Sequence, residues 1–419
     1  MSNKLGINTS NIFLLADTNQ LPVISNFISS IGTHLFRFPG GTTANFYHPK
    51  MPGYGYNRND LNLVEEGPIK KHMSDLMAAV PQNLNDVKFI DLFANWAAKE
   101  QYDVLYVANL FSGTIDEILF ALQTLCDNNV SIKGIELGNE YYLRAYNRIF
   151  PDAQSYIQKA KAFAEAIKLQ FPNIPVSLTV APTKTTKQLS QKETNWNKQI
   201  GHVNFYDAVS LHYYPIVNRV SDKNIQPCTF DESWEMGERL LTKTLAEIET
   251  TFSKPIWISE WNVMGGNKWC NNSVEHAYYT LLFLQRATLN TRVEYIIYHT
   301  VIGKGTGFNL LKPIGALIET NFNVFPLQIW NMLNVHLAKN DVDFAEARTS
   351  NFHYATFKST ANKSCLWGVN FNQENFEMNI NKQSIQHYEI NASGLTKKKV
   401  MDDKLTFTPK TLNMVLFQQ

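Results

Sequence analysis

Short apolar runs alternate with longer segments of helical periodicity along most of this chain, and this alternation constrains the fold more than any other feature. The clearest helical segment, Asp152–Gln170, has apolar residues at i, i+3/i+4 and i+7. Strands that alternate with helices through right-handed crossovers can close into a parallel barrel. The pattern therefore predicts a (β/α)8 TIM barrel with these eight strands: Leu5–Asn8, His34–Phe38, Val104–Ala108, Gly134–Leu137, Val176–Val180, Ala208–Leu211, Ile256–Ser259 and Val293–Tyr298.

The pattern changes near Asp341, where short alternating runs separated by turns replace the helices. These runs predict strands over Tyr354–Phe357, Cys365–Asn370, Phe376–Ile380, His387–Ile390, Lys404–Phe407 and Asn413–Phe417. The length of 419 residues suits a barrel of about 250 residues or more plus a small domain. We therefore predict the barrel over residues 1–340 and a C-terminal antiparallel β-sandwich over residues 341–419.

The charge balance excludes some classes of partner. Lys plus Arg number 38 and Asp plus Glu number 37, which argues against a broad surface for nucleic acid or an anionic membrane but leaves a neutral polysaccharide open. The sequence contains no run of about 18 apolar residues that could span a bilayer. No signal peptide is visible at the N-terminus, so we expect a cytoplasmic protein or an exported one with its signal removed.

Two glutamates follow predicted strands. Glu140 ends the sequence Gly134-Ile-Glu-Leu-Gly-Asn-Glu140, and Glu260 follows Pro255-Ile-Trp-Ile-Ser259. The carboxyl ends of barrel strands meet at one face of the barrel, where catalytic groups gather. Each glutamate alone could be an exposed loop residue or the partner of a core arginine. Together they are the minimal equipment for breaking a glycosidic bond.

Other polar residues near the strand ends could complete such a site. Arg37, between Phe36 and Phe38, needs an anionic partner when buried, and an ionised carboxylate nucleophile would serve, as would a structural salt bridge. His212 and Tyr214 are two positions apart, so in a strand their side chains point to the same side. They could orient a carboxylate or form a packed rim.

Further candidate substrate contacts are Asn139, Asn109 and Trp261. Asn139 could donate to a sugar hydroxyl, and Trp261 could pack on a sugar ring or desolvate Glu260. The histidines form no cluster with metal-ligand spacing and the HExxH pattern is absent, so we expect neither a metal nor a cofactor. Cys228 and Cys270 fall in two loops on the same predicted face, which leaves a disulfide possible.

These motifs resemble the clan of retaining (β/α)8-barrel glycoside hydrolases with a Glu/Glu catalytic pair. Its hallmarks are an Asn-Glu acid/base after strand four, here Asn139-Glu140, and a glutamate nucleophile after strand seven, here Glu260. Arg37-Phe-Pro-Gly-Gly41, His212-Tyr-Tyr214 and a C-terminal β-sandwich are similar to the arabinofuranosidase and xylosidase branches. Many members carry Trp at the end of strand eight, where this chain has Ile297-Tyr298-His299-Thr300, so Tyr298 is a further candidate substrate contact.

The resemblance implies hydrolysis of an oligo- or polysaccharide by double displacement. Glu140 would protonate the leaving oxygen, and Glu260 would attack the anomeric carbon. Two alternatives stay open: a carbohydrate-binding barrel without turnover, and a metal-dependent barrel enzyme of another reaction class. The sequence alone does not determine the sugar, the linkage, exo or endo action, or the oligomeric state.

Overall fold

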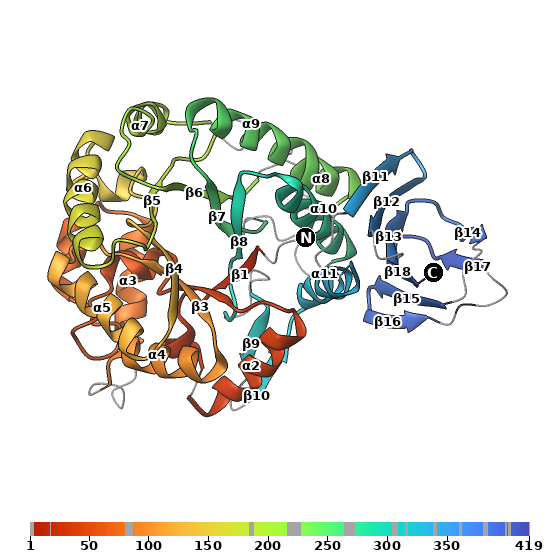
Figure 1. The fold of residues 1–419 in the computed structure, drawn as a ribbon, viewed down its shortest axis with the longest axis horizontal. Helices are drawn as coiled ribbons and strands as arrows, with labels where there is room; N and C mark the ends of the chain where they lie inside the picture. Colours follow the sequence, from red (N-terminus) through yellow and green to blue (C-terminus); the bar gives the residue numbers. More distant parts are fainter. Residues whose placement is uncertain are drawn as a thin grey trace.

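The computed structural model of the 419-residue chain contains a barrel followed by antiparallel sheets (Figure 1). The described residues are 4–16, 18–79, 87–183, 188–215, 228–263, 273–303, 309–314, 317–337, 342–359, 363–379, 384–398, 400 and 404–418.

Eight parallel strands form a closed barrel in sequence order, because the last strand pairs with the first. The prediction of a TIM barrel is thus confirmed, with strand ends shifted by no more than a few residues. The strands are β1 (Leu5–Asn8), β2 (Leu35–Phe38), β3 (Asp103–Val107), β4 (Ser131–Glu136), β5 (Val176–Thr179), β6 (Ala208–Tyr213), β7 (Ile256–Trp261) and β8 (Val293–Tyr298).

Helices surround the barrel and bury their apolar faces against it. They are α1 (Ile12–Leu15), α2 (Leu21–Ser30), α3 (Pro68–Ala78), α4 (Phe89–Glu100), α5 (Ile115–Asp127), α6 (Ala153–Gln170), α7 (Gln191–Ile200), α8 (Phe230–Trp234), α9 (Leu241–Thr251), α10 (Val274–Leu289) and α11 (Val324–Leu337). A short hairpin, β9 (Leu311–Ile314) with β10 (Leu317–Thr320), precedes α11.

Side chains fill the barrel interior in layers, because every second residue of a strand points inward. An apolar set forms one layer, and Gly134 accommodates its bulkiest member: a Cβ there would lie 2.3 Å from the ring of Trp257. Arg37, two positions beyond Leu35 on β2, is fully buried. The interior therefore changes from apolar to charged along the strands. The apolar layer comprises Leu35, Leu105, Ala208, Trp257 and Ile297.

The C-terminal region contains a six-stranded antiparallel sheet in the order β11-β12-β13-β18-β15-β16 and a two-stranded sheet, β14-β17. Side chains of both sheets share one apolar cluster, as the predicted β-sandwich requires. The predicted boundary at residues 340 and 341 lies outside the described residues. The strands are β11 (Val342–Arg348), β12 (Phe352–Ser359), β13 (Lys363–Asn370), β14 (Phe376–Asn379), β15 (Ser384–Asn391), β16 (Gly394–Lys398), β17 (Lys404–Phe407) and β18 (Leu412–Gln418).

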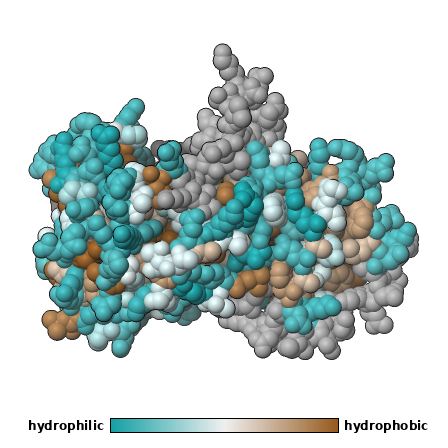
Figure 2. Space-filling view, turned by 90° about the horizontal axis from the view of Figure 1, so that it is seen from above, coloured by the Kyte–Doolittle hydropathy of each residue, from teal (hydrophilic) through white to brown (hydrophobic). Residues whose placement is uncertain are grey.

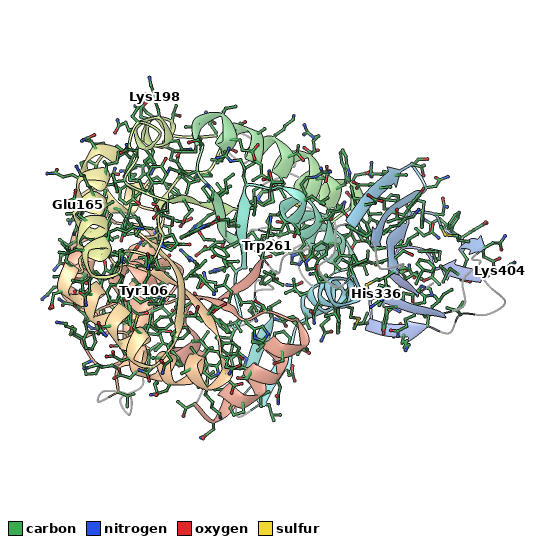
Figure 3. All side chains as sticks on the ribbon, in the orientation of Figure 1. Tyr106, Glu165, Lys198, Trp261, His336 and Lys404 are labelled. Carbon is green, nitrogen blue, oxygen red and sulfur yellow. The ribbon has the colours of Figure 1, made fainter. Side chains whose placement is uncertain are left out.

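The six-stranded sheet lies beside α10 and α11, which separate it from the barrel (Figure 1). His336 of α11, labelled at this junction in Figure 3, contacts the main-chain oxygens of Ser364 and Phe417 at 3.2 and 2.8 Å. Hydrophilic residues dominate the face seen in Figure 2, with hydrophobic ones dispersed among them. None of the helices within the described ranges combines the length and the apolar character needed to cross a bilayer.

Candidate active site

Glu260 lies at the end of β7 and points into the barrel, where several donors converge on its carboxylate. Its Oε1 accepts hydrogen bonds from Arg37 Nη1 at 2.6 Å and from Asn8 Nδ2 at 3.1 Å. Its Oε2 accepts one from the Tyr214 hydroxyl at 2.8 Å. The side chain is only 6% exposed. Glu260 is therefore a buried carboxylate whose charge is balanced by a cation.

These neighbours fix the ionisation of Glu260. Burial alone would raise the pKa of its carboxyl, but the surrounding groups more than offset this and hold the pKa below its usual range. The lowering groups are His212, His299, Arg37 and the hydroxyl of Tyr214. At neutral pH Glu260 is an anion, which is the form a nucleophile requires.

Arg37 links Glu260 to a second buried carboxylate, that of Glu136 on β4. Its Nε and Nη2 donate to Glu136 Oε2 at 2.9 and 2.6 Å, and Nη2 also donates to Asn139 Oδ1 at 2.9 Å. Burial by itself would lower the pKa of Arg37, and the two carboxylates reverse that shift. The guanidinium fork therefore holds the ends of β2, β4 and β7 in one charged network.

Glu140 stands just beyond β4, where the chain turns sharply. Gly138 has φ +101° and Glu140 has φ +55°, a left-handed conformation that costs a residue other than glycine about 1–2 kcal/mol. Such strain persists where surrounding contacts enforce it, and it is common at functional sites. Here Asn45 bonds both the main-chain nitrogen and the oxygen of Asn139, at 3.2 and 2.8 Å.

Tyr142 and His212 hold one oxygen of Glu140. Its Oε1 accepts from the Tyr142 hydroxyl at 3.0 Å and lies 3.0 Å from His212 Nδ1. Within the described part of the chain Oε2 makes no hydrogen bond, and the side chain is 23% exposed. Glu140 thus has one anchored oxygen and one available to a bound molecule, whereas both oxygens of Glu260 are bonded.

The contacts of His212 give an upper limit for the distance between the carboxylate oxygens of Glu140 and Glu260. Its Nδ1 lies 3.0 Å from Glu140 Oε1 and 3.6 Å from Glu260 Oε2, so these two oxygens are separated by at most the sum of the distances, about 6.6 Å. Carboxyl groups about 5–5.5 Å apart are typical of retaining glycosidases, and about 6.5–9.5 Å of inverting ones. The upper limit lies at the lower edge of the inverting range.

Five of the residues singled out from the sequence therefore lie in one network with Glu260. They are Arg37, Asn139, Glu140, His212 and Tyr214. The Nδ2 amide of Asn139 makes no hydrogen bond to the described residues, so it can donate to a ligand.

Trp261 and Tyr298 require a correction, because both are fully buried and offer no surface to a substrate. Successive residues of a strand alternate sides, so the side chain next to the inward-pointing Glu260 points outward. Trp261, labelled in Figure 3, stacks on Phe283 of α10 with ring centroids 4.0 Å apart. Tyr298 meets Trp261 edge to face at 5.0 Å.

Asn109 has a structural role in the loop after β3. Its Oδ1 accepts from the main-chain nitrogens of Phe111 and Ser112, each at 3.0 Å, and its Nδ2 donates to Tyr47 O at 3.2 Å. No contact of Asn109 with Glu140 or Glu260 is present. Its role in binding substrate stays a prediction.

Sequence reasoning missed Asn8, Glu136, Tyr142 and His299. Asn8 and His299 lie at or just beyond the ends of β1 and β8, so the rule that pointed to Glu140 and Glu260 would have found them too. His299 Nδ1 lies 3.7 Å from Glu260 Oε2.

The described residues contain no group of three or more His, Cys, Asp or Glu side chains arranged to hold a metal ion. Cys228 is disulfide-bonded, and Cys270 lies outside the described residues.

Several solved structures that match this fold are glycoside hydrolases. The α-L-arabinofuranosidase of Thermotoga maritima in complex with arabinose superposes with a TM-score of 0.67 at 14% identity, over 99% of this chain and 96% of that one. The chain has the fold of these enzymes.

Two further structures extend the comparison. A family 39 glycoside hydrolase from Bacteroides cellulosilyticus has a TM-score of 0.55 at 13% identity, over 99% of this chain and 81% of that one. A 4-O-α-L-rhamnosyl-β-D-glucuronidase from Fusarium oxysporum has a TM-score of 0.59 at 12% identity, over 99% and 95%. No family model matches the sequence, and no curated protein does.

Proposed function

We propose that this protein is a retaining glycoside hydrolase that acts on an oligo- or polysaccharide. The observation that carries the proposal is the unequal setting of two adjacent carboxyl groups. Arg37 and Tyr214 bond Glu260, which is kept ionised, while Tyr142 and His212 bond only one oxygen of Glu140. One group suits nucleophilic attack and the other proton transfer.

The reaction would take two steps. Glu140 donates its proton to the glycosidic oxygen while Glu260 attacks the anomeric carbon, which gives a glycosyl-enzyme and releases the leaving group. Glu140, now ionised, takes a proton from water, which attacks the same carbon and frees Glu260. The limit of about 6.6 Å on the separation of the two carboxylates favours direct attack over a mechanism with an intervening water. Asn139 Nδ2 would donate to a hydroxyl of the bound sugar.

A panel of aryl glycosides tests the activity. An aryl α-L-arabinofuranoside is the first substrate to try, because the Thermotoga enzyme of similar fold is an arabinofuranosidase. If wild-type protein binds oligosaccharides but hydrolyses no member of the panel, the alternative of a carbohydrate-binding barrel replaces this proposal. Undiminished turnover in the presence of a chelator would exclude the metal-dependent alternative.

Azide rescue tests the two roles separately. Glu140→Ala should form the glycosyl-enzyme readily from a substrate with a good leaving group and then stall. Azide should restore turnover and give a glycosyl azide of retained configuration. Glu260→Ala with azide should give the inverted product, because azide attacks from the vacated side.

NMR of the glycosyl azides decides the assignment. Glu165→Ala is the control, since Glu165 lies on α6 at the periphery of the molecule, as Figure 3 shows. If both catalytic variants give the same anomer, or the two configurations are exchanged, the assigned roles are wrong.

A further inference from the structure

The ends of β1 and β8 meet beside Glu260 through Asn8 and His299, to which the proposed mechanism gives no task. The two chain segments are joined at the main-chain oxygen of Asn8, which accepts from Thr300 Oγ1 at 2.6 Å and from the nitrogen of Val301 at 3.0 Å. Asn8 therefore has little freedom to move relative to His299.

The side-chain amide of Asn8 has only one orientation that fits its neighbours. The main-chain N–H of Ser10 donates to Asn8 Oδ1 at 2.9 Å, which turns Nδ2 towards Glu260 Oε1 and His299 Nδ1, each 3.1 Å away. Gly40 leaves room for this arrangement, because a Cβ there would lie 1.9 Å from Asn8 Oδ1. Asn8 Nδ2 is thus a fixed donor shared by Glu260 and His299.

A fixed donor determines the tautomer of the imidazole that faces it. Asn8 Nδ2 can only donate, so His299 Nδ1 must accept and the ring proton of the neutral form lies on Nε2. Protonating Nδ1 would set two donors against each other at 3.1 Å. It would also place a cation beside Glu260 Oε2, which lies 3.7 Å from Nδ1.

The groups around His299 act on its charge in opposite directions. Burial lowers the pKa of the imidazole, Glu260 and Glu140 oppose this, and Arg37 and His212 reinforce it, so that the pKa lies below its usual value. The Tyr214 ring lies edge-on at 6.3 Å, and its own pKa is raised well above the ordinary value, so it is a neutral neighbour.

We propose that His299 is a positioning residue for the nucleophile: its neutral imidazole holds Asn8 Nδ2 against Glu260, and protonation of the ring releases Asn8 and pairs Glu260 with a cation. This inference rests on the proposed function for its effect on turnover. The arrangement of Asn8 and His299 does not depend on it.

The pH profile of kcat/KM gives the first test. With an activated aryl glycoside, the wild type should lose activity about tenfold per pH unit below a midpoint under 6.5, the ordinary value for histidine. His299→Asn keeps an acceptor near the Nδ1 position but does not titrate. Measured relative to the variant's own activity at neutral pH, the acid limb should move down by more than one pH unit.

Two further variants sharpen this test. Asn8→Ala removes a donor to a charged oxygen and should lower kcat/KM by about tenfold to a hundredfold at neutral pH. His202→Asn changes an exposed histidine and should leave the profile unchanged. An acid limb that stays in place in His299→Asn would overturn the proposal.

Nitrogen NMR of histidine-labelled protein tests the same arrangement without using activity. The resonances lost in His299→Asn identify the ring, and they should show the Nε2–H tautomer with a midpoint below 6.5. The Asn8→Ala variant should raise that midpoint, because the neutral ring loses its donor.

The two readouts separate the two ideas. A protein that hydrolyses no glycoside but gives the expected tautomer and midpoint contradicts the proposed function and supports the Asn8–His299 arrangement. An Nδ1–H tautomer, or a midpoint at or above the ordinary value, overturns the arrangement whatever the activity.

Discussion

Arg37 contributes a planar fork as well as a positive charge. Three of its hydrogen bonds reach the carboxylates of Glu136 and Glu260, both buried in the barrel. A lysine has one compact ammonium group and cannot occupy both positions. Removing one partner of a buried ion pair costs about 3–5 kcal/mol, because the remaining charge is left uncompensated.

We therefore expect Arg37→Lys to lower kcat/KM at least a hundredfold and to reduce stability by a few kcal/mol. Glu136→Gln keeps the shape of its side chain and leaves the bond from Arg37 to Glu260 in place, so it should cost less activity than Arg37→Lys. Kinetics and urea unfolding of both variants check this. Arg348→Lys, on the β11 strand, serves as the control. Equal losses in Arg37→Lys and the control would contradict the role of the fork.

His276 should make the fold sensitive to acid. This histidine of α10 is fully buried, and burial lowers its pKa to about 4, with a hydrogen bond to Asn323 offsetting only part of the shift. Between pH 6.5 and about 4 the unfolded chain binds a proton here and the folded chain does not. Stability should thus fall by about 3 kcal/mol as the pH drops through this window, and should not change above it on account of this group.

The His276→Gln variant tests this attribution. Its side chain does not titrate. The slope of the unfolding free energy against pH between 6.5 and 4 should therefore decrease by the amount that corresponds to about one bound proton. His202→Gln, at an exposed position, should keep the wild-type slope. If the slope is unchanged in His276→Gln, acid sensitivity must come from other groups.

At the scale of elements, α7 holds the loop that follows β4. Lys192 Nζ donates to Tyr141 O at 3.0 Å, to Asn147 Oδ1 at 2.7 Å and to Phe150 O at 2.6 Å. The same loop carries Tyr142, which bonds Glu140. The helix therefore supports the loop that carries the candidate acid/base through contacts of Lys192 with two main-chain oxygens and one side-chain oxygen.

Lys192→Met should loosen this loop and impair proton transfer selectively. We expect turnover of a glycoside with a poor leaving group to fall about tenfold or more, since general acid catalysis contributes about 10²–10⁴-fold, while a substrate with a good leaving group should be affected less. Lys198→Met changes an exposed lysine of the same helix, labelled at the edge of the molecule in Figure 3, and should have no effect. Equal losses on both substrates would argue against selective damage to Glu140.

The barrel strands could be predicted because each is a short apolar run, and burial on both faces is what such runs indicate. Elements with weaker apolar patterns were missed. Helix α7 is polar except for Trp196 and Ile200, although its capping box of Ser190 and Glu193 was a usable signal. In the β9–β10 hairpin Pro313 interrupts the run, which is tolerated because β9 and β10 form a two-stranded sheet, in which both are edge strands.

The positions of residues at the strand ends predicted which of them could lie close together in the site, but not the direction in which each side chain points. The prediction for Trp261 was wrong for this reason. Strand β7 changes register between Ile258 and Trp261. Counting alternate residues from the start of the strand therefore does not show whether Glu260 or Trp261 points inward. The Asn8–His299 contact joins the first and last strands of the barrel, β1 and β8. The two residues are 291 positions apart in sequence, so no local pattern encodes the contact.

Barrel and C-terminal sheets share one hydrophobic core at the scale of the whole molecule. Buried residues of β13 and β18 belong to the same apolar cluster as those of α10 and α11. Trp367 of β13 donates to Gln285 of α10 at 2.9 Å, and His353 of β12 bonds the hydroxyl of Tyr278. An interface of buried apolar groups with satisfied polar pairs couples the stability of its two sides.

We therefore expect the full chain to unfold in a single thermal transition, with calorimetric and van't Hoff enthalpies that agree. Trp367→Ala should reduce stability by about 3–5 kcal/mol and lower the temperature at which activity is lost together with the calorimetric midpoint. Phe407→Ala, in the separate cluster between the two C-terminal sheets, provides the comparison. It removes a similar apolar area but lies away from the helices that contact the barrel. Two resolved transitions, with activity lost in only one of them and Trp367→Ala shifting only the other, would show that the barrel is stable independently of the sheets that cover α10 and α11.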